Sequence, residues 1–192
     1  KKSPLELTLC ISMVKKIVVI GPESTGKSTL CEALADHYQT TWCREYAREF
    51  LLQNGTRYTY DDLLLIAQGQ VLREEEAVKA TEALYPDGSG VLFIDTDMYV
   101  MKVWCEYVFG KCHPYILDQI AIRKYDHYLL CNTDIPWKQD HLREYPNLAP
   151  RQELLHMYKD ILINQSTPWI LVEGDHEDRI SQSTAAVNSI LP

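Results

Sequence analysis

A short apolar run that ends abruptly in a glycine-framed loop sets the framework for this chain. Residues 17–20 read IVVI, and residues 21–29 continue as GPESTGKST. An unbroken apolar run before a glycine is typical of a buried strand, and Leu30, Ala33 and Leu34 then recur at helical spacing. The segment therefore predicts a strand, a tight loop and a helix in direct succession.

The loop matches the pattern G-x-x-x-x-G-K-[ST], with Gly21 and Gly26 as its glycines. In this pattern the backbone N–H groups of the loop and of the following helix surround phosphate oxygens. Lys27 would place a positive charge near the β and γ phosphates, and the Ser28 hydroxyl can bind Mg²⁺. We therefore expect ATP and Mg²⁺ as cofactors. The residues of this loop expected to bind the nucleotide are Gly21, Glu23, Ser24, Thr25, Gly26, Lys27, Ser28 and Thr29.

The composition of the chain limits its partners. It has 192 residues, 46% of them hydrophobic, which is enough for one domain with a sizeable core. The formal net charge of -8 argues against a nucleic-acid partner, and no apolar run approaches the length of a membrane span. The six cysteines include no C-x-x-C pair, so we expect reduced thiols in a cytoplasmic protein. The oligomeric state stays open.

The first residues permit two interpretations. Apolar and polar residues alternate within 1–12, which could add an edge strand. Alternatively, Met13 is the natural start, which would make 1–12 a leader or tag-like extension. In that case we expect a single domain over 13–192.

Charged residues follow a second predicted strand at 40–43. The next residues, REYAREF at 44–50, open a helix that ends near Asn54. Ligands of open α/β sheets bind at the carboxyl ends of the strands, so Glu45 and Arg48 are candidate site residues. The alternative is a solvated helix face, but its i,i+4 pairs are like-charged and would be mildly unfavourable.

Two carboxylates follow the predicted strand VLFI at 91–94. A carboxylate in this position can bind Mg²⁺ or a water that it carries, so Asp95 is the expected metal ligand together with Ser28. Asp97 could then orient or deprotonate the attacking hydroxyl, a role that Glu45 could also fill. The alternative is that Asp97 or Thr96 caps the following helix.

Residues 132–151 show little periodicity and contain three prolines. Loops of this length in compact domains are lids or disordered segments, and their aromatic and arginine content argues against disorder here. We expect a lid over about 134–151 that excludes water and brings Arg143 and Arg151 to the transferred phosphoryl group. The alternative is a surface loop whose arginines pair with neighbouring glutamates.

Further helices follow from the pattern of apolar residues. Thr59 and Asp62 resemble a capping box at the start of a long helix, in which the acidic run at 74–76 is expected to be solvated. A helix carrying Trp104 is expected to end at Gly110. Another helix is expected from about residue 152 to residue 164.

The remaining apolar runs predict two more strands, at 125–131 and 169–173. We expect His127 on a half-exposed face of the first of them. Arg179 lies in the turn after the second and is a candidate for the adenine side of the nucleotide. The predicted fold is an α/β P-loop NTPase of the kinase type, with a five-stranded, mainly parallel sheet flanked by helices and a lid.

Three motifs, taken in order, resemble those of a known family. They are EYARE at 45–49, DTD at 95–97 and D-x-P-W-x-x-D-x-x-R at 134–143. With the phosphate loop they resemble the kinase domain of NadR-like nicotinamide-riboside kinases, within the P-loop kinase and AAA-type ATPase superfamily. The resemblance implies ATP- and Mg²⁺-dependent phosphorylation of the ribose 5'-hydroxyl of nicotinamide riboside. The product would be nicotinamide mononucleotide, in a salvage step toward NAD.

This resemblance implies a nucleoside substrate with a charged pyridinium ring. Aromatic faces and carboxylates suit such a ring. The candidate substrate-binding residues are Glu45, Tyr46, Arg48, Asp97, Trp104, Asp134 and Trp137. The candidate catalytic residues are Lys27, Asp97, Glu45, Arg143 and Arg151. A glycine typical of the family after Asp140 is replaced by His141, so the lid hinge departs from the family pattern.

Two other functions compete with this interpretation. A kinase of another nucleoside or small metabolite would use the same nucleotide site, and a neutral nucleoside would suit the acidic chain nearly as well. A regulatory P-loop ATPase, whose product is a conformational change, belongs to a different class. Against a guanine-reading switch, Asn132, Thr133 and Asp134 lack the lysine of the N-K-x-D signature.

Overall fold

The computed structural model of the protein describes residues 14–191. The extension expected at 1–12, with its alternative as an edge strand, lies outside the described residues. Two strands are shorter than expected, because only residues 42–43 and 127–131 pair with neighbouring strands. Within residues 14–191, no helix combines the length and apolar character needed to cross a membrane.

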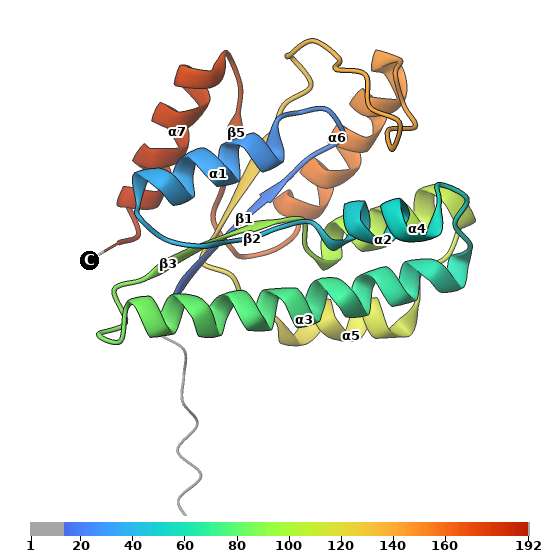
Figure 1. Ribbon diagram of the computed structural model, residues 1–192. Helices are drawn as coiled ribbons and strands as arrows, with labels where there is room; N and C mark the ends of the chain where they lie inside the picture. The colour runs from blue at the N-terminus through green and yellow to red at the C-terminus, as the bar shows by residue number, and fades with distance from the viewer. Residues whose placement is uncertain (1–13, 192) are drawn as a thin grey trace, which may run out of the picture.

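A five-stranded sheet forms the centre of the molecule (Figure 1). Each strand pairs in parallel with its neighbours, as in the register of Val18 with Ile94 on one side and Tyr128 on the other. This confirms the expected α/β class, and the sheet is wholly parallel. In spatial order the strands are β2 (Trp42–Cys43), β3 (Val91–Asp95), β1 (Lys15–Ile20), β4 (His127–Cys131) and β5 (Trp169–Val172).

Helices cover both faces of the sheet (Figure 1). One face carries α1 beside α7, and the other carries α3, α4 and α6, with α2 and α5 packed against α3 and α4. Parallel sheets require such cover on both faces. The helices are α1 (Lys27–His37), α2 (Tyr46–Asn54), α3 (Tyr60–Leu84), α4 (Met98–Phe109), α5 (Pro114–Ile122), α6 (Leu148–Ile163) and α7 (His176–Asn188).

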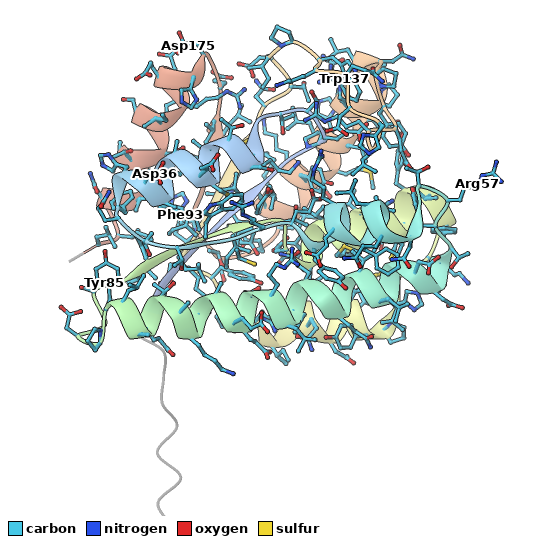
Figure 2. The ribbon with its side chains drawn as sticks, viewed as in Figure 1. Asp36, Arg57, Tyr85, Phe93, Trp137 and Asp175 are labelled. Carbon is cyan, nitrogen blue, oxygen red and sulfur yellow. The ribbon has the colours of Figure 1, made fainter. Side chains whose placement is uncertain are left out.

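Successive side chains of β1 point to opposite faces of the sheet and so pack in two different hydrophobic clusters. Ile17 and Val19 pack in the cluster under α1 and α7, whereas Val18 and Ile20 pack in the cluster under α4 and α6. All four are fully buried, and burying an aliphatic side chain of this size contributes about 1.5 to 3 kcal/mol. Phe93 lies among the strands beneath α1 (Figure 2). The apolar run therefore forms the central strand because both of its faces are covered.

The strand order places the site. The chain crosses from β1 to one side of the sheet for β2 and β3, and continues on the other side with β4 and β5. The carboxyl end of β1 is therefore the topological switch point, where ligands of open α/β sheets bind. The phosphate loop, at residues 21–26, emerges there.

Several expected helix boundaries are confirmed. The side chain of Thr59 accepts from the N–H of Asp62, whose own side chain accepts from the N–H of Thr59, so the capping box is complete. Gly110 ends α4 with a φ of 68°, the left-handed conformation that glycine adopts at little cost. By contrast, α6 begins at Leu148, before the expected start, so the end of the predicted lid is helical.

Two expectations about exposure were wrong. His127 is buried, because β4 is paired on both sides, and its Nδ1 lies 2.9 Å from the carbonyl oxygen of Tyr128. Of the acidic run expected to be solvated, Glu75 and Glu76 are exposed, but Glu74 is only 2% exposed. Its carboxylate pairs with Arg123 at 2.9 Å and with Lys16 at 3.5 Å. A buried carboxylate needs such partners, and both come from segments distant in sequence.

Candidate functional site

The phosphate loop has the backbone conformation that its glycines permit. Gly21 and Gly26 have φ values of 145° and 80°, and Ser24 between them has 58°. A Cβ at position 21 would lie 2.7 Å from the carbonyl oxygen of Cys131, so only glycine fits beside the end of β4. The loop leads directly into α1, whose first residue is Lys27. Free N–H groups at that end of the helix suit a phosphate.

Side chains of the loop and of α7 hold this conformation. Thr25 Oγ1 and Lys27 Nζ donate to the carbonyl of Pro22 at 2.7 and 2.9 Å. Arg179, expected on the adenine side, is buried and donates from Nη1 to the carbonyl of Thr25 at 2.9 Å. Arg179 therefore braces the loop from behind. Thr29 is exposed and lines the central cavity.

Ser28 and Asp95 lie together, as the sequence predicts for metal ligands. Ser28 Oγ donates to Asp95 Oδ2 at 2.5 Å, and Asp95 Oδ1 is buried without a hydrogen-bond partner among residues 14–191. Burial, followed by the nearby charge of Glu45, raises the pKa of Asp95 to about 6. A buried, unpartnered carboxylate oxygen beside a hydroxyl is a donor set that fits Mg²⁺, which prefers few protein oxygens plus phosphate and water.

A cavity of about 230 Å³ extends from the phosphate loop. Loop residues from Gly21 to Thr29 form one end of it. Helices α2, α4 and α6 and the segment before α6 form the rest. The residues there that concern its chemistry are Glu45, Arg48, Trp104, Tyr107, Arg143 and Tyr145. The cavity thus joins a phosphate-binding end to an aromatic end that carries charged groups.

The aromatic end is held by a chain of hydrogen bonds. Trp104 Nε1 donates to the hydroxyl of Tyr58 at 2.8 Å, and that hydroxyl donates to Glu144 Oε2 at 3.0 Å. The rings of Tyr107 and Tyr145 meet edge to face, with centroids 5.7 Å apart. The carboxylate of Glu144 is thereby fixed at the end of the cavity that Trp104, Tyr107 and Tyr145 line.

The segment between β4 and α6 is docked on the phosphate loop. The carboxylate of Glu23 accepts from the N–H groups of Glu144 and Tyr145, the first at 3.0 Å. Ser24 Oγ accepts from the N–H of Lys138 at 3.0 Å and from Arg143 Nη1 at 3.2 Å. The expected lid therefore lies over the nucleotide end of the cavity. A second tie is the ion pair between Arg48 and Asp140, with nitrogen and oxygen 2.8 Å apart.

The two expected lid arginines share one aromatic ring. The guanidinium carbons of Arg143 and Arg151 lie 5.7 and 5.2 Å from the ring centroid of Trp137. Figure 2 shows Trp137 in the segment above α6. Arg151 lies in the first turn of α6 and is 4% exposed, with Nε and Nη1 unpartnered among the described residues. Trp137 therefore supports these arginines and does not line the cavity.

Asp97 occupies a different position from the one predicted for a catalytic group. It is buried at the start of α4, where its Oδ1 accepts from the N–H groups of Tyr99 and Val100. Its Oδ2 accepts from the hydroxyl of Tyr128 at 2.8 Å, and burial raises its pKa to about 7. Both oxygens are committed and neither lines the central cavity, so the alternative of a helix cap describes this residue.

Two other expected substrate residues also lie away from the cavity lining. The ring of Tyr46 packs against Gly69 on α3, and the guanidinium of Arg73 lies over that ring. Asp134 accepts from Arg179 and from the N–H of Gly174, so it links the lid to the start of α7. Both residues support the site from behind.

The comparison with known proteins follows this geometry. A family model described as an AAA domain matches residues 16–179. The chain belongs to the AAA domain family. The chain is 27% identical over 183 residues to the trifunctional NAD biosynthesis/regulator protein NadR of Escherichia coli K12, and 27% identical over 183 residues to that of Salmonella typhimurium LT2. These matches confirm the resemblance to NadR, and they cover 93% of this chain but only 43% of each relative.

Solved structures of similar fold agree with this assignment. NadR protein in complex with NR has a TM-score of 0.73 at 23% identity, over 93% of this chain and 50% of that chain. NadR with NAD and AMP-PNP has a TM-score of 0.69 at 22% identity, with the same coverage. Deoxyadenosine kinase from M. mycoides, with products dCMP and a flexible dCDP bound, has a TM-score of 0.61 at 13% identity, over 91% and 100% of the chains. At these identities the likeness establishes the P-loop kinase-type fold alone.

The sequence did not predict several residues that line the cavity or support its wall. Tyr107 follows Trp104 by three residues, so helical spacing alone could have placed it on the same face. Glu144 and Tyr145 lie within the predicted lid but carry no motif. Tyr58 gave no signal, because its role depends on contacts with α4 and with the lid.

Proposed function

We propose that the protein transfers the γ-phosphoryl group of ATP to the ribose 5'-hydroxyl of nicotinamide riboside, giving nicotinamide mononucleotide. The observation that carries the proposal is the single cavity with the phosphate loop at one end and an aromatic wall with a fixed carboxylate at the other. The similarity of the chain to NadR, a protein solved in complex with NR and with AMP-PNP, supports the choice of nicotinamide riboside and ATP as ligands. We place this reaction in the cytoplasm, on a small-molecule nucleoside.

The nucleotide end would hold the triphosphate. Backbone N–H groups of residues 23–28 would surround the phosphates, and Lys27 would leave the carbonyl of Pro22 for the β and γ oxygens. Ser28 and Asp95 would hold Mg²⁺, which would offset the negative charge of the phosphates. The Ser28 hydroxyl and the unpartnered Asp95 oxygen are then both used.

Glu45 is the group best placed to act on the acceptor hydroxyl. It occupies the N-cap position of α2 without a side-chain capping bond, lines the cavity and lies near enough to Asp95 to raise the pKa of that carboxyl. In the proposed step the ribose oxygen bonds to the γ phosphorus, the bond from that phosphorus to the β-phosphate oxygen breaks, and the hydroxyl proton passes to Glu45. ADP is the leaving group.

The lid would supply positive charge to the reacting phosphoryl group. Arg143 lines the cavity and already contacts the phosphate loop through Ser24. Arg151 has buried N–H groups without partners among the described residues, and Trp137 holds both arginines at one ring. Charge of this kind stabilises the transferred group in kinases.

The aromatic end would recognise the pyridinium ring. Trp104, Tyr107 and Tyr145 offer ring faces or edges, and Glu144 adds a negative charge fixed by Tyr58. Each cation–π contact is worth about 0.5 to 2 kcal/mol. A neutral nucleoside would gain the stacking but not the charge interaction, so the geometry favours the cation.

A panel of nucleosides, each supplied with ATP and Mg²⁺, tests this proposal. We expect the highest kcat/KM for nicotinamide riboside, and a Trp104→Leu variant should raise its KM about tenfold, because a cation–π contact is lost. A matched Trp42→Leu variant, on the outer strand β2, should leave KM unchanged. A higher kcat/KM for a neutral nucleoside would assign the site to that nucleoside. ATP hydrolysis that responds to no acceptor would instead indicate a regulatory ATPase.

A further inference from the structure

A buried glutamine on α3 joins the two chain segments that carry the site carboxylates. Gln70 is 1% exposed and lies on the buried face of α3, one turn after the apolar residues Ile66 and Ala67. Its Oε1 accepts from the N–H of Tyr46 at 2.7 Å, and its Nε2 donates to the carbonyl of Thr96 at 2.9 Å. One side chain thus connects the start of α2 with the end of β3.

Each of these bonds is made beside a carboxylate of the proposed site. Tyr46 follows Glu45, which lines the cavity, and Thr96 follows Asp95, whose carbonyl lies 3.3 Å from the same Nε2 of Gln70. A shift of either backbone segment would therefore move the carboxylate next to it. Among residues 14–191, Gln70 is the only residue whose side chain forms hydrogen bonds with the backbone of both segments.

The backbone at Thr96 needs to be held. Its φ of 77° is in the left-handed region, which β-branched residues rarely adopt. Such conformations persist where surrounding contacts determine them, and they cluster at functional sites. The N–H of Thr96 is bonded to the carbonyl of Val19 at 3.2 Å, and its carbonyl is bonded to Gln70. Without Gln70 only one of these two restraints on the peptide groups remains.

Neighbouring residues of α3 hold the other segment in the same way. A Cβ at Gly69 would lie 2.1 Å from the ring of Tyr46, so glycine is required for that ring to reach the helix. Arg73, one turn further along, stacks its guanidinium 4.9 Å from the ring centroid and donates to the carbonyl of Glu45 at 3.4 Å. Gly69, Gln70 and Arg73 thus hold the backbone of residues 45 and 46 against α3.

We propose that Gln70 is a positioning residue that sets the separation between Glu45, at the acceptor, and Asp95, at the metal. The inference rests on the proposed function, because it assigns those carboxylates to a phosphoryl transfer. Gln70 touches neither ligand in this arrangement. It acts through the backbone segments that carry the reacting groups.

Replacing the side-chain nitrogen of Gln70 by oxygen tests whether Gln70 positions the two carboxylates or only fills space in the core. Gln70→Glu keeps an acceptor for the N–H of Tyr46 but removes the donor to Thr96 and Asp95. We expect kcat to fall on the order of 100-fold, as for a displacement of about 1 Å at a reacting group. The Kd for ADP, measured without Mg²⁺, should stay unchanged, because the bonds of Gln70 do not involve the phosphate loop. Gln68→Glu is the matched control, since Gln68 is exposed on the same helix.

A second variant guards against misfolding. Gln70→Met removes both bonds without introducing a charge, and it should also lower kcat while leaving the Kd for ADP unchanged. Wild-type kcat in either folded variant would overturn the proposal. Loss of folding and of ADP binding in both would overturn it too, because Gln70 would then support the fold as a whole.

The failure of the proposed function would be distinct. If the wild-type protein phosphorylates no nucleoside, the acceptor assignment fails. The same comparison is then made on Mg²⁺-dependent ATP hydrolysis, in which water is the acceptor. A variant rate equal to that of the wild type there would overturn the positioning role independently.

Discussion

Two carboxylates only two positions apart have separate roles in this protein. Asp95 bonds to Ser28 beside the phosphate loop, whereas Asp97 caps α4 and accepts from Tyr128. The left-handed residue Thr96 lies between them. The DTD motif therefore combines one candidate metal ligand with one structural cap.

Asp97 makes the stability of the folded protein depend on pH. Burial raises its pKa to about 7, above the value of about 4 expected in the unfolded chain. The folded state therefore binds more protons between these pH values, so the contribution to stability is full below about pH 4 and is lost as pH rises through about 7. The free energy of unfolding should fall across this window, by at most about 1.4 kcal/mol per pH unit.

An Asp97→Asn variant tests that assignment. Asparagine keeps an oxygen for the N–H groups of Tyr99 and Val100, and its amide can donate to the Tyr128 hydroxyl. We expect the free energy of unfolding, measured by urea titration from about pH 5 to about pH 8, to depend less steeply on pH near neutrality. Asp95, whose pKa is also raised, to about 6, keeps a dependence at lower pH in the variant. Asp118→Asn, at an exposed site on α5, is the control. An unchanged slope in the Asp97 variant would assign the dependence to other groups.

At the scale of elements, the lid and the phosphate loop form one unit. Glu23 accepts from two lid N–H groups, and Ser24 accepts from Lys138 and Arg143. The part of the loop expected to contact only phosphates thus also holds the segment that covers them. We therefore expect the position of the lid to depend on Glu23.

A Glu23→Gln variant should loosen the lid. Glutamine retains one acceptor oxygen, and a hydrogen bond to a charged group is worth about 1.5 to 3 kcal/mol, so the open form should gain about tenfold or more in population. Trypsin cleavage after Lys138 and Arg143 measures that population. Glu32→Gln, exposed on α1, should leave cleavage unchanged. Equal cleavage rates in both variants would show that Glu23 does not hold the lid.

The sequence predicted elements whose signals are local. The phosphate loop, the capping box at Thr59 and the glycine end of α4 each depend on residues within a few positions. Glu74 and His127 were misjudged because their burial depends on partners far along the chain, such as Lys16 and the strands beside β4. Asp97 shows the same limit, since its partner Tyr128 lies 31 positions away.

At the scale of the whole molecule, the parallel sheet brings the site together. The segments after β1, β2, β3 and β4 all reach one edge of the sheet, and they supply the phosphate loop, Glu45, Asp95 and the lid. Motif order could predict that these groups converge. It could not predict which of them line the cavity, because Tyr46, Asp134 and Trp137 have the expected residue types but serve as supports.

The central claim is that one cavity joins ATP to a nucleoside hydroxyl. Phosphorus NMR of a reaction containing the protein, ATP, Mg²⁺ and nicotinamide riboside tests it most directly. We predict ADP and an equal amount of a phosphate monoester whose resonance is split by the 5'-methylene protons of the ribose. Inorganic phosphate with no monoester, or a monoester coupled to a different ribose position, would contradict the account.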